Sequence, residues 1–317
     1  MAETISDVGE HPMIRRLTAG LAAHPQVVLG PGDDGAVLRF KGDVVVSTDT
    51  MVEDVHFKRA WSSAHDIGRK AVASAVADLE AMGARPVGIV IALNVSATET
   101  TQWIDGLQQG VLCECERAGC ALVGGDLSRS QQAVITGTVL GDLEGRAPVR
   151  RAGALPGQSI AYCGNLGMAE AGLAVLRRGF SSPAAVVRAH RFPDPPYRQG
   201  IVAAEAGATA MIDISDGLVA DLRHVAQASG VRLELDTARF SANEHQQRVA
   251  AALGGIDPAQ FILAGGDDHA LVATFAADRV PDGWQVIGEV SEGEACVLVD
   301  GAEWAPTGGW DHFSDSR

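Results

Sequence analysis

The sequence predicts an α/β or α+β protein built from two related α/β domains. Short apolar runs typical of strands alternate with longer segments of helical periodicity along the chain. At 317 residues the chain is long enough for two domains of ordinary size. Two runs also echo each other, Leu-Val-Gly-Gly-Asp at 122–126 and Leu-Ala-Gly-Gly-Asp at 263–267. A loop rich in Arg, Gly and Pro separates these halves, so we predict domains at 1–148 and 149–317.

Composition and charge exclude several classes of protein. Hydrophobic residues make up 46% and charged residues 21%, and no apolar run reaches the roughly 18 residues that would predict a membrane span. Residues 1–10 are polar and the five cysteines are scattered, which favours a reducing, cytoplasmic setting. The net charge of -15 would repel nucleic acids and anionic lipids. A phosphate ligand would therefore need bound metal ions to neutralise its charge.

The N-terminal half alternates strand-like and helix-like segments. A glycine-rich turn carries Asp33 and Asp34 and leads into a short strand. A capping-box pattern at 63–66 begins a helix that runs to Met82, with Gly83 after it. The other elements predicted here are strands at 44–46, 87–95, 121–123 and 132–141 and a helix at 98–118.

The C-terminal half follows the same alternation. Each sheet is expected to carry its helices on one face. The predicted strands are 159–163, 210–213, 231–235, 269–275, 284–290 and 296–299. The predicted helices are 169–178, 183–190, one that ends near 206, 216–229 and 241–253.

Polar residues at the ends of predicted strands suggest a metal site. The stretch 47–57 follows the strand at 44–46 and gathers hydroxyls, carboxylates and an imidazole. Oxygen ligands of this kind suit hard cations such as Mg²⁺. For any single Asp, an ordinary solvated turn would be explanation enough. That alternative weakens because the pattern of strand, then Gly or Ser, then Asp recurs four more times.

Two carboxylates fall where burial is expected. Asp78 shares the apolar face of its helix with Ala75 and Met82, and Asp213 lies inside a predicted strand. A buried carboxylate is destabilising unless it is paired or bound to a metal. A hydrogen-bonded structural role is the alternative at Asp78, and a helix N-cap would explain Asp216.

Common signatures of phosphate-binding and nucleophilic enzymes are missing. None of the three lysines lies in a G-x-x-x-x-G-K-[ST] frame, and the kinase H-R-D and D-F-G runs and the G-x-S-x-G elbow are absent from the sequence. An aspartate-lined cleft that holds several Mg²⁺ ions is the site that the sequence predicts. Phosphoryl transfer is the reaction class in which metals and positioning supply most of the catalysis.

Several motifs follow one another along nearly the whole chain. They are Gly32-Asp33-Asp34, Ser47-Thr48-Asp49-Thr50 with His56-Phe57, Ala77-Asp78-Leu79-Glu80-Ala81-Met82-Gly83-Ala84, Gly124-Gly125-Asp126, Ile212-Asp213-Ile214-Ser215-Asp216-Gly217-Leu218, Gly265-Gly266-Asp267-Asp268 and Trp310-Asp311-His312-Phe313. In this order they resemble the motif set of the thiamine-monophosphate kinase family. That family belongs to the superfamily of aminoimidazole-ribonucleotide synthetase and selenophosphate synthetase.

The resemblance implies a fold and an activity. The N-terminal α/β domain would bind metal and ATP and pair its sheet with its twin in a homodimer, and the C-terminal α/β domain would cover the ATP cleft. The enzyme would phosphorylate thiamine phosphate to thiamine diphosphate, with ATP as co-substrate, by direct in-line transfer. Its partners would be these small molecules and a second copy, with no nucleic acid and no membrane.

The resemblance also implies a role for each residue of the motifs. Metal ligands would be Asp34, Ser47, Thr48, Asp49, Asp78, Asp126, Asp213 and Asp216. ATP contacts would come from Gly125, Asp126, Arg151 and Ser215, and thiamine phosphate contacts from His56, Asp267 and Trp310. Trp310 would offer its ring face to the cationic thiazolium, and His56 would hold the substrate phosphate. No catalytic side chain is implied, because the attacking phosphate oxygen, with a second pKa of about 6, is already largely anionic.

The chain departs from the family pattern on the substrate side. The usual Gly-Gly-Glu-Asp-Tyr is Gly-Gly-Asp-Asp-His here, so that Asp267 is one methylene shorter and His269 replaces a tyrosine. Two alternatives to the kinase are a sister enzyme that uses ATP to activate an amide or formyl oxygen, and an acidic divalent-ion-binding dimer without turnover. Selenophosphate synthesis is disfavoured because no cysteine precedes Cys113.

Overall fold

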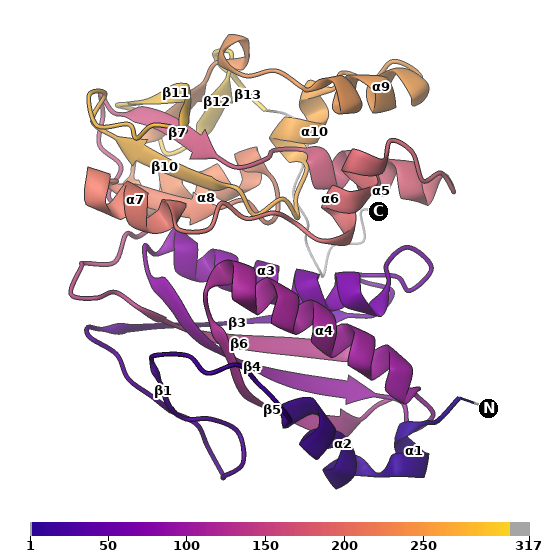
Figure 1. Ribbon diagram of the computed structural model, residues 1–317. Coiled ribbons are helices and arrows are strands. Elements are labelled where there is room, and N and C mark those ends of the chain that lie inside the picture. The colour runs from indigo at the N-terminus through magenta and orange to yellow at the C-terminus, as the bar shows by residue number, and fades with distance from the viewer. Residues whose placement is uncertain (1, 305–317) are drawn as a thin grey trace. The chain divides into compact units, whose positions relative to one another are not determined.

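The computed structural model describes residues 2–304 and confirms the predicted mixed α/β class (Figure 1). The chain divides into two compact units. Unit 1 contains residues 1–79 and 84–146, and unit 2 contains residues 80–83 and 147–317. No helix within residues 2–304 combines the length and the apolar character needed to cross a membrane.

Unit 1 is built on a four-stranded sheet with the strand order β3-β6-β4-β5. The strands are β3 (Val44–Val52), β4 (Arg85–Val95), β5 (Ala121–Arg129) and β6 (Val134–Asp142). Strand β6 is antiparallel to both β3 and β4, whereas β4 and β5 are parallel. Helices α3 (Ala64–Ala81) and α4 (Thr101–Ala118) lie across one face of this sheet (Figure 1).

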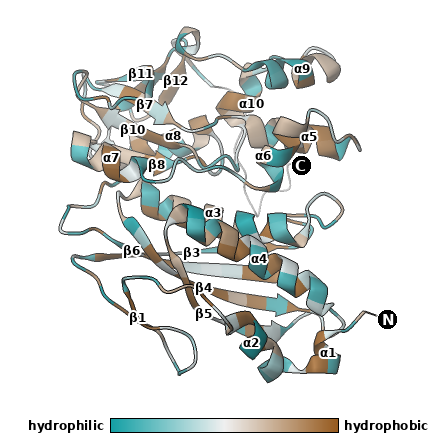
Figure 2. Cartoon of the chain, viewed as in Figure 1, coloured by the Kyte–Doolittle hydropathy of each residue, from teal (hydrophilic) through white to brown (hydrophobic). Residues whose placement is uncertain are grey.

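Local signals define the helices of unit 1. The Thr100 side chain accepts a hydrogen bond from the Trp103 amide at the start of α4, and Gly119 ends the helix in the left-handed conformation. The smaller elements are α1 (Ile5–Val8), α2 (Glu10–Thr18) and the antiparallel strands β1 (Val27–Leu29) and β2 (Val37–Leu38). Strand β4 is largely hydrophobic, as Figure 2 shows, because it lies inside the sheet.

Unit 2 contains a seven-stranded sheet with the order β13-β12-β9-β11-β7-β10-β8. The strands are β7 (Ser159–Cys163), β8 (Ala210–Asp213), β9 (Arg232–Leu235), β10 (Leu271–Phe275), β11 (Gln285–Ser291), β12 (Val297–Val299) and β13 (Ala302–Glu303). The helices are α5 (Met168–Arg177), α6 (Ala184–Arg191), α7 (Gln199–Ala206), α8 (Leu218–Ser229), α9 (Glu244–Ala252) and α10 (Ala259–Ala264), with a 3₁₀ turn at Thr237–Arg239.

The sheet of unit 2 carries helices on both faces, which corrects the prediction of one covered face. On one face Val272 belongs to the same buried cluster as Leu222 of α8, and on the other Ala273 belongs to a cluster with Ala203 of α7. All five residues of β10 are buried. A continuous apolar run, rather than an alternating one, is typical of a strand covered on both sides.

Two predicted strands are longer than expected, and the two similar runs at 122–126 and 263–267 do not adopt the same structure. Strand β3 continues to Val52 through the polar motif, and β5 continues to Arg129 through the glycine motif. Gly125 is therefore a strand residue, where a Cβ would come within 2.0 Å of the Ile91 carbonyl oxygen of β4. The matching run at 263–267 instead follows helix α10, so the similarity of the two runs is not structural.

Candidate functional site

Ser47 and Asp78 meet on the helix-covered face of the sheet in unit 1. The Ser47 hydroxyl donates a hydrogen bond of 2.5 Å to Oδ2 of Asp78. This contact shows that the Asp78 side chain of α3 points toward the sheet. Asp49 projects to the same face as Ser47, since residues two apart in a strand share a face. Two predicted metal ligands are thus in direct contact, and a third lies on their side of the sheet.

The register of the sheet separates the remaining predicted ligands of unit 1. Asp49 of β3 pairs with Gly137 of β6. The row of paired residues that begins with this pair continues across β4 and ends at Gly125 of β5. A Cβ on Gly137 would meet the Ala75 side chain of α3, so this row faces the helices. The next row ends at Asp126. Because adjacent rows project to opposite faces, Asp126 points to the face without helices.

Asp49 and Asp126 are therefore not ligands of one common site within a single unit. They lie on the two outer strands, β3 and β5. Neighbouring strands are about 4.8 Å apart, so the backbones of these two outer strands are about 14 Å apart. The two side chains also project from opposite faces of the sheet. Thr48 shares the open face with Asp126 but lies at the β3 edge, where its hydroxyl contacts that of Thr138 at 3.0 Å. One copy of unit 1 therefore does not bring Asp49 and Asp126 together.

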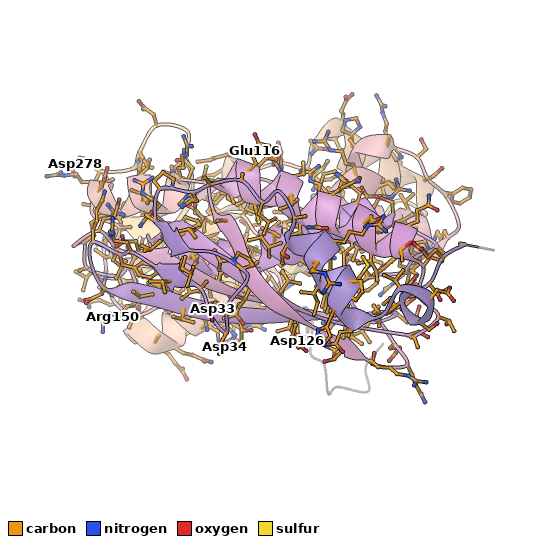
Figure 3. All side chains as sticks on the ribbon, turned by 60° about the horizontal axis from the view of Figure 1, so that its bottom comes forward. Asp33, Asp34, Glu116, Asp126, Arg150 and Asp278 are labelled. Carbon is orange, nitrogen blue, oxygen red and sulfur yellow. The ribbon has the colours of Figure 1, made fainter. Side chains whose placement is uncertain are left out.

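Asp126 and Gly125 border a pocket of unit 1. Its walls are mostly apolar and come from α2 and α4, for example Ile14 and Leu107. Pro31 lines the same pocket and begins the exposed loop that carries Asp34, a loop that Figure 3 shows on the same side of unit 1 as Asp126. The Ser128 hydroxyl donates to Oδ2 of Asp126 at 2.6 Å and orients its carboxylate.

His56 follows β3 in a turn that determines which ring nitrogen carries the proton. The Val52 amide donates a hydrogen bond of 2.9 Å to Nδ1. Nδ1 is therefore the unprotonated nitrogen, and Nε2 carries the hydrogen. The buried Lys70 ammonium donates to the His56 carbonyl at 3.2 Å and holds the turn. The half-buried imidazole is thereby fixed as the Nε2–H tautomer.

In unit 2 the segment from β8 to α8 carries the predicted ligands Asp213 and Asp216 and the predicted ATP contact Ser215. The buried Asp221 carboxylate accepts hydrogen bonds of 3.0 to 3.1 Å from the amides of Ser215, Asp216 and Gly217. Burial, followed by repulsion from Asp213, raises the pKa of Asp221 to about 7. The helix N-cap is Gly217, so the alternative role of Asp216 as the cap is wrong.

A second loop packs directly against this segment. The Asp267 amide donates to the Ser215 carbonyl at 2.8 Å, and the His269 amide donates to the Ile214 carbonyl at 2.9 Å. Between them Asp268 is buried, and its carboxylate accepts hydrogen bonds from the Gly167 and Ala169 amides at the start of α5. Burial raises the pKa of Asp268 to about 7.

Two further predicted site residues, Arg151 and Trp310, have no described side-chain contact with the other site residues. The Arg151 side chain is exposed, while its carbonyl accepts a hydrogen bond from the Ser229 hydroxyl at 3.1 Å. Trp310 lies outside the described residues.

Asp221 and Asp268 were not among the predicted site residues. Their carboxylates accept hydrogen bonds from backbone amides and so position the two loops. The signal for Asp221 was its place in the first turn of α8, where carboxylates favour the amides of a helix start.

The donor types fit a hard divalent cation. Ser47, Asp49 and Asp78 in unit 1, and Asp213 and Asp216 in unit 2, offer only oxygen atoms. Among residues 2–304, no three His, Cys, Asp or Glu side chains are close enough to form a metal site by themselves. Hydroxyl groups and oxygen atoms of a bound ligand would have to complete the coordination.

Comparison with known proteins identifies relatives along nearly the whole chain. The family model of AIR synthase related protein, N-terminal domain, matches residues 32–143, and that of the C-terminal domain matches residues 156–301. A thiamine-monophosphate kinase of Mycobacterium tuberculosis is 46% identical over 313 residues, which are 98% of this chain and 94% of the relative.

Solved structures of thiamine-monophosphate kinases are also similar to this chain. A thiamine-monophosphate kinase from Stenotrophomonas maltophilia is 31% identical, with a TM-score of 0.80 and coverage of 92% of this chain and 95% of that chain. The structure of AaThiL complexed with AMPPCP and TMP is 31% identical, with a TM-score of 0.79 and coverage of 97% and 98%.

Proposed function

The chain belongs to the thiamine-monophosphate kinase family, and we propose that it transfers the terminal phosphoryl group of ATP to thiamine phosphate, giving thiamine diphosphate. The observation that carries this conclusion is the 31% identity, over 97% of the chain, to AaThiL complexed with AMPPCP and TMP. The product would be formed by direct in-line attack of a substrate phosphate oxygen on the terminal phosphate. That oxygen is largely anionic near neutral pH, so no general base is needed.

Several Mg²⁺ ions would neutralise the phosphates of ATP and its transition state, which is the chemistry that such ions supply when bound. The proposed ligands in unit 1 are Asp34, Ser47, Thr48, Asp49, Asp78 and Asp126, and in unit 2 they are Asp213 and Asp216. The support is chemical, because these side chains are hard oxygen donors and the net charge of -15 leaves few cations to hold polyphosphate.

The nucleotide is proposed to contact Gly125 and Asp126 in unit 1 and Arg151 and Ser215 in unit 2. The apolar pocket beside Gly125 and Asp126 suits the flat adenine ring, since ligand pockets are mostly apolar with a few polar groups that fix orientation. The exposed Arg151 guanidinium can reach phosphate oxygens as a bidentate donor.

Thiamine phosphate is proposed to contact His56, Asp267 and Trp310. The tautomer of His56 supports this assignment, because the Val52 amide occupies Nδ1 and Nε2–H becomes the donor that faces an anionic ligand. Asp267 is half-buried and offers a carboxylate to the cationic end of the substrate. The role of Trp310 rests on the family resemblance alone.

A homodimer is proposed because one copy of unit 1 cannot bring Asp49 and Asp126 together. The face without helices also exposes apolar side chains on β3, with Val46 60% exposed and Val44 43% exposed. Covering this face with the same face of a second copy would bury them and would follow two-fold symmetry. Asp126 of each copy would then project into the interface, and it could share a site with Asp49 of the other copy only around the edge of the outer strand β3, because Asp49 faces the helices.

We place the enzyme in the cytoplasm. All five cysteines are free, including the buried Cys115 and Cys120, which fits a reducing compartment. A hydrogen bond with Cys120, followed by burial, raises the pKa of the Cys115 thiol, which disfavours the reactive thiolate.

The test is a turnover assay with purified protein, ATP, Mg²⁺ and thiamine phosphate, run with and without chelator. We expect thiamine diphosphate and ADP in equal amounts, and loss of both when the chelator is present. ADP release with amide or formyl acceptors, and none with thiamine phosphate, would instead support the sister-enzyme activity. Metal binding without any ADP release would support the ion-binding dimer.

A further inference from the structure

The loop 265–269 holds two residues in a backbone conformation that side chains rarely adopt. Asp267 and His269 have φ values of 68° and 54°. Left-handed backbone at non-glycine residues is destabilising and persists where surrounding contacts enforce it, often at functional sites. Here the amides of both residues donate to carbonyls of the β8–α8 segment, Ser215 and Ile214. The conformation turns the His269 side chain back toward β8.

The His269 ring lies against Asp213, one of the proposed metal ligands. Nδ1 of His269 is 3.0 Å from Oδ2 of Asp213, and the two residues are 6% and 5% exposed. An ionised carboxylate only accepts hydrogen bonds, so the imidazole N–H is the donor. Oδ2 takes part in this bond, so Asp213 can offer Oδ1, or the second lone pair of Oδ2, to a cation.

The same ring lies close to the proposed substrate side of the site. Nε2 of His269 is 3.9 Å from Oδ1 of Asp267, whose side chain is 35% exposed. The imidazole is therefore interposed between a buried carboxylate on β8 and a more exposed carboxylate on the loop. His269 is also the position at which this chain departs from the tyrosine of the family pattern.

We propose that His269 is a positioning residue for the metal site, a role that rests on the proposed function. Its imidazole fixes the Asp213 carboxylate in one orientation and ties the loop that carries Asp267 to strand β8. Hydrogen-bond partners of metal-binding carboxylates commonly change metal affinity 10- to 100-fold when they are removed. The buried surroundings strengthen the effect, because water does not replace the lost donor.

The experiment measures Mn²⁺ binding to the full chain by the electron paramagnetic resonance signal of the free ion. Wild-type protein is compared with His269→Leu, which removes the donor, and His269→Asn, whose amide N–H can take the place of Nδ1–H. The matched control is His190→Leu, because His190 is a buried histidine of α6 that has no proposed role. Melting curves establish that each variant is folded.

We expect His269→Leu to lose about 10- to 100-fold in Mn²⁺ affinity, His269→Asn to recover most of that loss, and His190→Leu to bind as the wild type does. Wild-type affinity in folded His269→Leu would overturn the inference, as would an Asn variant that binds no better than the Leu variant. Should the Leu variant not fold, His269→Ala serves in its place. Absence of thiamine phosphate turnover in the wild type would instead count against the proposed function.

Discussion

Asp49 and Asp126 end neighbouring rows of one four-stranded sheet, yet their side chains project from opposite faces of it. Both carry proposed metal-binding roles. A single copy of unit 1 therefore leaves each carboxylate without the other, and a second copy is required if both serve one site. The proposed homodimer would supply that second copy, and the proposal can be tested directly.

Mixing two inactive variants should restore activity. Asp49→Asn and Asp126→Asn are each expected to lower kcat about 100-fold, because each removes a metal-binding carboxylate. After exchange of subunits, half of the dimers are mixed, and each mixed dimer has one site with both carboxylates intact. About a quarter of wild-type turnover should therefore return.

The mixing control uses two preparations of the same variant, treated identically. The two variants are denatured together and then refolded, so that copies of one can pair with copies of the other. If the mixture of Asp49→Asn and Asp126→Asn stays as inactive as its parents although mixed dimers form, then both residues act from the same copy or in different sites.

Replacing Ser47 should weaken metal binding more than folding. Ser47→Ala removes the hydroxyl that lies 2.5 Å from Asp78, and we expect the Mg²⁺ concentration for half-maximal activity to rise about 10-fold. The loss in stability should stay near 1 kcal/mol, the usual contribution of one hydrogen bond. The control is Ser74→Ala, which changes a buried serine of α3, the helix that carries Asp78. An unchanged Mg²⁺ dependence would exclude Ser47 from the metal site.

Element type could largely be predicted from the sequence, whereas strand length at the motifs could not. Helix α4 begins and ends at residues with clear capping chemistry, Thr100 and Gly119. Strands β3 and β5 run through polar or glycine-rich motifs that resemble turns. Pairing with β6 and β4 overrides those local preferences, because each paired backbone group gains a hydrogen bond inside the sheet.

The face of the sheet from which each site residue projects depends on how strands far apart in the sequence pair with one another. Local sequence patterns do not determine that pairing. The placement of Asp78 on the buried face of its helix could be predicted from the apolar periodicity, whereas its contact with Ser47 could not, because Ser47 was expected to follow the strand and not to belong to it. The separation of Asp49 from Asp126 depends on which residues of β4 and β6 lie between them. A shift by one residue would reverse the face of each side chain.

His56 should affect the affinity for thiamine phosphate and leave that for ATP unchanged. His56→Asn keeps an oxygen that can accept the Val52 amide but lacks the Nε2–H donor. A hydrogen bond to a charged phosphate contributes about 1.5 to 3 kcal/mol, so KM for thiamine phosphate should rise at least about 10-fold. His65→Asn, on α3 and outside the proposed site, is the control. Equal changes in KM for both substrates would contradict the assignment.

Asp268 should make the protein less stable as the pH rises. Burial raises its pKa in the folded state from the ordinary 3.8 to about 7. Between these values the folded protein holds a proton that the unfolded chain has released. The stabilisation is therefore complete below about pH 4 and is lost as the pH rises through about 7.

Melting temperatures of wild-type protein and Asp268→Asn should therefore converge or cross between pH 5 and pH 8, with the wild type losing on the order of 2 kcal/mol relative to the variant. The exposed Asp278, replaced by Asn, controls for the loss of one carboxylate and should run parallel to the wild type (Figure 3). A constant difference between wild type and Asp268→Asn would mean that the Gly167 and Ala169 amides keep Asp268 ionised throughout this range.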